Sequence, residues 1–176
     1  IGTTTKTFVE IGVGNGLENN SLYLLLQGWH GLWIEGNPEY IEQINDKFSY
    51  ALNNGTLKIR HAWVQRDQIN RLIEEGWGST EELDLFSLDI DGNDYHVLEA
   101  MESLRARVIL LEYNAKFHPP AKWVMAHNPD HAHDGSDYFG CALKSYEELL
   151  SAKGYKLVGC NLLGVNAFFV REDLLG

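Results

Sequence analysis

The sequence contains little cysteine and little positive charge. Its two cysteines, Cys141 and Cys160, are too few for the disulfide framework of a small secreted domain, so we expect a reducing, cytoplasmic environment. The chain has 14 lysines and arginines but 25 acidic residues, which gives a formal net charge of −11. A protein that binds the phosphate backbone needs a basic face, so this balance argues against a nucleic-acid partner.

Long apolar runs are absent as well. No stretch reaches the ~18 consecutive apolar residues of a membrane-spanning helix, and no signal peptide precedes the first expected strand. We therefore expect no membrane partner. The length of 176 residues and the hydrophobic fraction of 44% are ordinary for one globular domain, which we predict over residues 1–176.

Three glycines lie close together near the N-terminus, at alternate positions. The apolar run 8–13 predicts a buried parallel strand, and Gly12, Gly14 and Gly16 follow one another at its end. A helix is expected soon afterwards, over residues 19–27. Because glycine has no Cβ, the backbone of such a turn lets a ligand approach closely. Strand, glycine turn and helix together predict a cradle for a nucleotide-like ligand.

The spacing of these glycines distinguishes between two kinds of cofactor. The fingerprint of dinucleotide-binding proteins has a small residue three positions after the second glycine, where this chain has the bulky Leu17. The third glycine is Gly16 instead, and Glu10 precedes the group inside the strand. The resulting pattern, E-x-G-x-G-x-G, resembles motif I of the class I S-adenosylmethionine (SAM) methyltransferases. A glycine-rich turn that holds no ligand is the alternative.

Apolar runs and helical patterns alternate along the rest of the chain. Further strands are expected at residues 32–35, 57–64, 83–90 and 108–113, with a closing hairpin of 155–160 and 165–170. Five strand–helix units followed by a hairpin predict an α/β fold, in which helices cover both faces of an open, mostly parallel sheet. In such a sheet the ligand lies outside the carboxyl ends of the strands, beside the first strand.

The residues that follow each strand are therefore candidates for the site. The second strand ends in Glu35, followed by Gly36 and Asn37, and a carboxylate there can accept hydrogen bonds from both hydroxyls of a ribose. Trp63 lies at the end of the third strand, where it can flank an adenine or belong to the core.

These strand ends carry a resemblance to a family. The segments Phe8–Gly16, Leu32–Pro38, Leu85–Tyr95 and Val108–Asn114 resemble the FkbM-like branch of the class I SAM methyltransferases. The resemblance implies a Rossmann-like sheet with strand order 3-2-1-4-5-7-6, SAM as cofactor, and methyl transfer to a hydroxyl of a sugar or secondary metabolite. The candidate cofactor-binding residues are Glu10, Gly12, Gly14, Gly16, Glu35, Gly36, Asn37, Trp63 and Asp89.

A second resemblance adds a metal ion. Metal-dependent O-methyltransferases of macrolide and aminocoumarin biosynthesis carry L-D-G-D-x-Y after the fourth strand and D-D after the fifth. The corresponding segments here, 89–95 and 112–114, imply Mg²⁺ or Mn²⁺ bound by Asp89, Glu112 and Asn114, with Asp91 nearby. The second pair is split in this chain, and one member is an amide. The alternative is a site without metal, in which Asp89 binds the cofactor and Glu112 hydrogen-bonds a loop.

A long loop over residues 114–140 interrupts the regular alternation and contains three of the four prolines. A loop of this length is usually a lid or a binding loop. Its histidines are His118, His127, His131 and His133. A zinc site is disfavoured because the histidines have no Cys partner and no metal-ligand spacing. Imidazole titrates near neutral pH, so we expect His118, nearest to the fifth strand, to act as the catalytic base, with Asp89 as a second catalytic candidate.

The sequence thus predicts a SAM-dependent methyltransferase with a small-molecule acceptor, and it leaves a homo-oligomer open. In the predicted reaction an acceptor oxygen attacks the sulfonium methyl group in line, and the protein positions the two reactants. Two other classes remain open. One is an NAD-linked oxidoreductase, which Leu17 disfavours, and the other is a SAM-binding module without catalysis.

Overall fold

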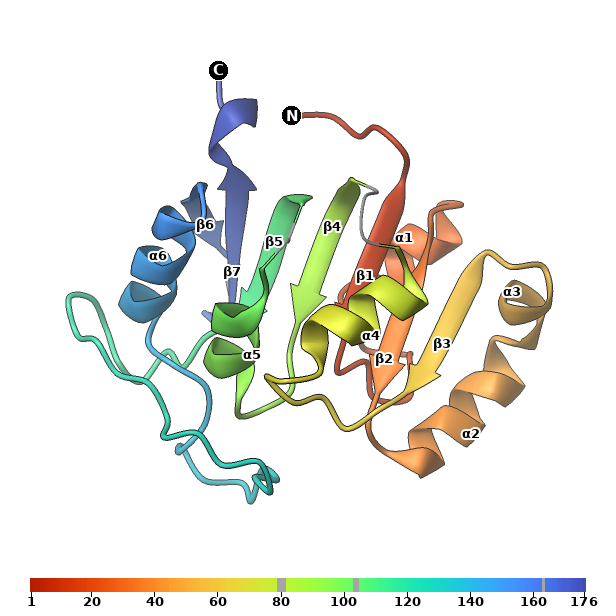
Figure 1. Cartoon of the computed structure of the whole chain (residues 1–176), viewed down its shortest axis with the longest axis horizontal. Helices are drawn as coiled ribbons and strands as arrows, with labels where there is room; N and C mark the ends of the chain where they lie inside the picture. The colour runs from red at the N-terminus through yellow and green to blue at the C-terminus, as the bar shows by residue number, and fades with distance from the viewer. Residues whose placement is uncertain (79–81, 103–104, 163) are drawn as a thin grey trace.

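Seven strands form one sheet in the computed structural model, which describes residues 1–78, 82–102, 105–162 and 164–176 (Figure 1). The strands are β1 (Thr7–Ile11), β2 (His30–Glu35), β3 (Leu57–His61), β4 (Leu83–Leu88), β5 (Ala106–Glu112), β6 (Tyr155–Cys160) and β7 (Asn166–Arg171). β1 to β5 are parallel, and β7 pairs antiparallel with β5 and β6. The order β3-β2-β1-β4-β5-β7-β6 confirms the predicted fold class and strand order.

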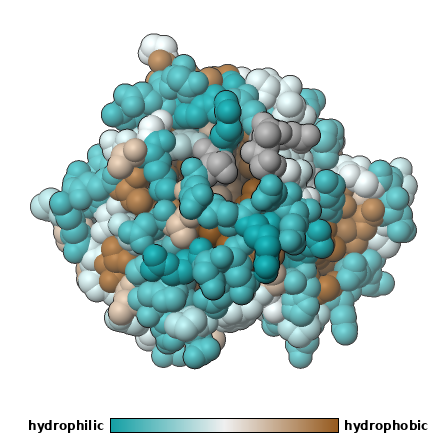
Figure 2. All heavy atoms as spheres, in the orientation of Figure 1, coloured by the Kyte–Doolittle hydropathy of each residue, from teal (hydrophilic) through white to brown (hydrophobic). Residues whose placement is uncertain are grey.

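The helices cover both faces of this sheet (Figure 1). They are α1 (Leu22–Leu26), α2 (Pro38–Lys47), α3 (Ser49–Asn53), α4 (Ile69–Gly76), α5 (Asp94–Ala100) and α6 (Leu143–Ala152), with a short 3₁₀ turn, η1 (Glu172–Leu174). The outer surface that they present in Figure 2 is largely hydrophilic, with small separate apolar patches. Among the helices of the described residues, none is long and apolar enough to cross a membrane.

The strand residues divide between two hydrophobic clusters because successive side chains point to opposite faces of the sheet. On one face Phe8 and Trp33 pack with Leu25 of α1 and Ile44 of α2. On the other face the cluster joins strand residues to side chains from α4, α5 and α6, and it includes Val9, Ile11, Leu32, Ile34, Ile69, Val97 and Tyr146. Because both faces of the sheet are covered, all five residues of β1 are buried, including the polar Thr7 and Glu10.

The first helix is shorter than the sequence predicts. It begins at Leu22 rather than at residue 19, with Ser21 as its N-cap. The Asn19 Oδ1 accepts the N–H of Leu22 at 3.0 Å, and the N–H of Asn20 and of Ser21 both donate to the buried Glu10 carboxylate. These bonds keep residues 19–21 in a turn that lies against the end of β1.

The long loop between β5 and α6 lies beyond the carboxyl ends of the parallel strands, at the lower left of Figure 1. Its two halves meet in an isolated antiparallel bridge between Val124 and Cys141. Asn114 anchors the start of the loop to its end, since its Nδ2 donates to the carbonyl oxygens of Asp137 (2.8 Å) and Phe139 (3.1 Å). The loop is therefore held beside the edge of the sheet at which a ligand is expected.

Candidate cofactor and carboxylate site

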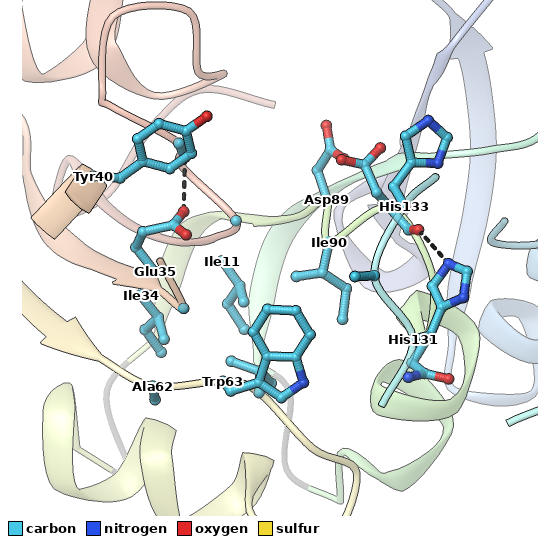
Figure 3. Close-up of a pocket in the computed structure, with 17 residues that line it drawn as sticks. Ile11, Ile34, Glu35, Tyr40, Ala62, Trp63, Asp89, Ile90, His131 and His133 are labelled. Atoms are coloured by element: carbon cyan, nitrogen blue, oxygen red, sulfur yellow. Dashed lines mark hydrogen bonds between the residues drawn. The ribbon is translucent and has the colours of Figure 1, made fainter. Parts of the chain in front are cut away.

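A pocket opens at the carboxyl ends of β1, β2 and β4 (Figure 3). Six of the nine predicted cofactor residues line it, namely Gly12, Gly14, Glu35, Gly36, Trp63 and Asp89. Trp63 is 53% exposed, so the structure places it in the pocket wall rather than in the core. The position of the pocket beside β1 is the one that an open α/β sheet predicts.

Glu35 stands at the end of β2 and faces the glycine loop (Figure 3). Its Oε2 accepts the N–H of Gly14 at 2.8 Å, and its Oε1 accepts the N–H of Asn37 at 2.8 Å. Each carboxylate oxygen has a second lone pair, so both can still accept a hydrogen bond from a ligand. The carboxylate is thus fixed in place by two backbone amides, in the lining of the pocket.

Gly12 allows the ends of β1 and β4 to come together. A Cβ at this residue would lie 1.6 Å from the carbonyl oxygen of Asp89, and its φ of +79° is in the left-handed region. The N–H of Asp89 in turn donates to the carbonyl oxygen of Ile11 at 3.0 Å. Any side chain at residue 12 would push Asp89 out of the pocket wall.

The other three predicted cofactor residues, Glu10, Gly16 and Asn37, are not among the described residues that line the pocket. Glu10 is fully buried and holds residues 20 and 21, and burial raises its pKa. A Cβ at Gly16 would lie 2.8 Å from both Trp33 and Phe48. Asn37 caps α2 by accepting the N–H of Glu39 at 2.9 Å. These three residues stabilise the glycine loop and the start of α2, whereas residues beside them line the pocket.

Three carboxylates gather at the ends of β4 and β5. Oxygen atoms of Asp89, Asp91 and Glu112 all lie within 4.8 Å of one another. Burial, followed by the negative charge of Glu112, raises the pKa of Asp89 to about 9. Burial and the charges of Asp91 and Asp94 raise the pKa of Glu112 to about 7. This concentration of hard oxygen donors suits Mg²⁺ or Mn²⁺, because a divalent cation would offset the mutual repulsion of the carboxylates, which adds to the effect of burial on both pKa values.

The predicted metal ligand Asn114 is placed differently. Its side chain is fully buried, its Nδ2 binds the loop carbonyls of residues 137 and 139, and its Oδ1 accepts the N–H of Lys116 at 3.1 Å. Asn114 therefore organises the loop, and Asp91 provides the third carboxylate oxygen of the cluster. An amide at a strand end can serve either purpose, and the sequence pattern does not distinguish the two.

The histidines of the loop are also arranged differently from the prediction. His118 is exposed and is not among the described residues that line the pocket, although it is nearest to β5 in sequence. His131 and His133 line the pocket instead (Figure 3). Nothing in the sequence spacing separates these two from His118 or His127. Tyr40, in the first turn of α2, and Asn93 line the pocket too, and both follow strand ends that the sequence did identify.

Comparison with known proteins identifies the fold. No family model matches the sequence, and no curated protein is similar to it. Among solved structures, a putative caffeoyl-CoA O-methyltransferase from Staphylococcus aureus has a TM-score of 0.58 at 14% identity, over 94% of this chain and 75% of that one. The O-methyltransferase from Bacillus cereus in complex with S-adenosylhomocysteine (SAH) has a TM-score of 0.56 at 13% identity, over 93% and 72%. The Methanococcus jannaschii fibrillarin pre-rRNA processing protein has a TM-score of 0.58 at 12% identity, over 97% and 70%. The chain has the α/β fold of the SAM-dependent methyltransferases.

Proposed function

We propose that the protein is a SAM-dependent methyltransferase that methylates a hydroxyl group of a small molecule, such as a sugar or a secondary metabolite. The hydrogen bond between the Glu35 carboxylate and the Gly14 amide carries this proposal. It brings a diol-binding carboxylate beside a glycine loop whose backbone is open to the pocket. Ile34, Ile90 and Trp63 add apolar lining that suits a purine ring.

In the proposed reaction the acceptor oxygen attacks the methyl group in line with the departing sulfur, and the protein chiefly positions the two reactants. The acceptor hydroxyl must lose a proton. We assign this step to His133, which lines the same pocket as Asp89. Its ring is oriented by an edge contact with Phe139, with ring centroids 5.5 Å apart. This assignment replaces His118, which is not among the described residues that line the pocket.

The proposal includes a divalent cation held by Asp89, Asp91 and Glu112. The fit rests on the three carboxylate oxygens, which lie close enough to share one ion. When bound, Mg²⁺ or Mn²⁺ would act as a Lewis acid for the acceptor hydroxyl. The side chain of Asn114 holds the long loop in place through its hydrogen bonds, and this loop places His133 in the lining of the pocket.

Calorimetric titration with SAM, SAH and NAD tests the cofactor first. We expect SAM and SAH to bind and NAD not to bind; binding of NAD alone would indicate an oxidoreductase. Transfer is then measured with SAM labelled on its methyl group and a panel of hydroxylated small molecules. Tight SAM binding with no labelled product from any acceptor pool would support a binding module without catalysis.

A further inference from the structure

Residues 126–133 of the long loop, here called the strap, connect two sides of the pocket. Asn128 of the strap contacts the segment that follows β4, and Pro129 contacts the segment that follows β3. His131, Ala132 and His133 line the pocket from the strap. The strap thus completes a wall that the strand ends leave open.

The contact with the β4 segment begins with a reciprocal pair of hydrogen bonds. The Nδ2 of Asn93 donates to the carbonyl oxygen of Asn128 at 2.6 Å, and the N–H of Asn128 donates to the Oδ1 of Asn93 at 3.2 Å. Asn93 is 7% exposed and itself lines the pocket. Its amide therefore links the pocket wall directly to the strap.

His131 makes the second contact with the same segment. Its Nε2 lies 3.1 Å from the carbonyl oxygen of Asp91, as the dashed line in Figure 3 marks. Because a carbonyl can only accept, this nitrogen carries the proton. The ring lies against Gly92, where an added Cβ would stand 2.4 Å from the His131 Cδ2. The absence of a side chain at Gly92 therefore leaves the space that the imidazole occupies.

On the side of β3 the strap is held by the carbonyl oxygen of Pro129. It accepts the Nε1–H of Trp63 at 3.2 Å and the Nε2–H of Gln65 at 2.8 Å. The orientation of the Trp63 indole thus depends on the strap. In Figure 3 Trp63 and His131 lie on different sides of the same pocket. The orientations of both side chains therefore depend on the position of the strap.

We infer that His131 is a positioning residue that locks the strap over the cofactor and sets the rate at which the cofactor exchanges. The inference rests on the proposed function, because it takes SAM and SAH as the ligands of this pocket. Opening the wall requires the imidazole to leave Gly92 and the Asp91 carbonyl, and it disturbs the bonds of Pro129 with Trp63 and Gln65. Exchange of a ligand behind such a wall is slower than exchange from an open groove.

The test is the rate of SAH binding and release, measured by stopped-flow fluorescence of the tryptophans. In His131→Ala and in Gly92→Ala we expect both rate constants to rise about twofold to tenfold, the range for one hydrogen bond, with a smaller change in the dissociation constant. Gly92→Ala acts from the other side of the contact, since its methyl group displaces the ring. His131→Gln keeps an N–H donor and is expected to recover much of the slow exchange.

Lys122→Ala is the matched control, because this exposed residue of the same loop pairs with Glu148 on α6. It should exchange SAH at the wild-type rate. Wild-type exchange rates in His131→Ala and Gly92→Ala, with native circular dichroism, would overturn the inference. If His131→Ala is poorly folded, Gln65→Ala removes a bond on the β3 side of the strap and should also speed exchange. Absence of SAH binding in the wild-type protein would instead contradict the proposed function.

Discussion

The Oε2 of Glu35 accepts the backbone N–H of Gly14 at 2.8 Å, so the end of β2 and the glycine loop after β1 are joined by a charge-assisted hydrogen bond. The bond fixes the carboxylate at the place where the proposed cofactor would present its ribose. The same carboxylate also holds the N–H of Asn37, at the start of α2. A change at Glu35 therefore affects both the ligand and the loop that surrounds it.

Replacing Glu35 with alanine should weaken SAM binding about tenfold or more, since a hydrogen bond to a charged group contributes roughly 1.5–3 kcal/mol. Glu35→Gln should lose less, because its amide oxygen still accepts one hydrogen bond. Isothermal titration calorimetry measures both. Unchanged affinity in the two variants would mean that the ribose is bound elsewhere.

Gly14→Val should abolish SAM binding in calorimetry. No described atom lies within 4 Å of a Cβ built at residue 14, so the side chain would extend into the space of the ligand. The φ of +55° at residue 14 adds backbone strain to the valine variant. A valine at Gly28 serves as the control for this strain, because its φ is also positive. Gly28 has a φ of +79° and an equally open Cβ position, but it lies at the end of α1. Gly28→Val should lower the melting temperature similarly and still bind SAM, whereas equal binding by both variants would rule out this role for the glycine loop.

The buried carboxylate of Asp84 should make stability depend on pH. Burial alone would raise its pKa, but hydrogen bonds from the N–H groups of residues 4–6 outweigh burial, and the pKa is lowered. Arg107 lies 3.3 Å away as an ion-pair partner. A lowered pKa means that the stabilisation is present above the ordinary value of about 3.8 and is lost as the pH falls through the lower folded value.

Asp84→Asn should therefore lower the free energy of unfolding by about 1–3 kcal/mol at neutral pH, with a difference that shrinks below about pH 4. Urea denaturation at a series of pH values measures it. Asp46→Asn, an exposed position on α2, is the control and should show little change. If the free energy of unfolding of Asp84→Asn stays below that of the wild type by the same amount from neutral to acidic pH, the lowered pKa of Asp84 is contradicted.

The carboxylate cluster should bind one Mn²⁺ ion per chain, detected by electron paramagnetic resonance without any acceptor. Asp89→Asn and Glu112→Gln should each weaken this binding, because each removes a charged oxygen ligand. Turnover should stop in EDTA and return with Mg²⁺ or Mn²⁺, while SAM affinity stays largely intact. Full activity in EDTA, or Mn²⁺ affinity unaffected by both substitutions, would leave His133 as the base acting without a metal.

The sequence predicts the fold well because its main signals are local. The buried run before Gly12, the acidic end of the second strand and the alternation of elements each follow from burial on both faces of a parallel sheet. The pocket residues Glu35 and Asp89 follow from the same rule, since the carboxyl ends of parallel strands share one edge.

The sequence is less informative where a residue's role depends on the long loop. His118 is the nearest histidine to β5 along the chain, but the loop brings His131 and His133 to the pocket. Asn114 looks like a ligand by position, yet its amide is used within the loop. The spacing of the glycines also does not show that Gly14 and Gly16 have different roles. Gly14 is open to the pocket, whereas Gly16 packs against the rings of Trp33 and Phe48.

A crystal structure of the protein with SAH and Mg²⁺ would show directly whether Glu35 holds the ribose of the cofactor. We expect the ribose hydroxyls of SAH to bind the Glu35 carboxylate, with the adenine between Trp63 and the strap and the sulfur towards Asp89. SAH bound outside this pocket, or a ribose that makes no contact with Glu35, would contradict this expectation.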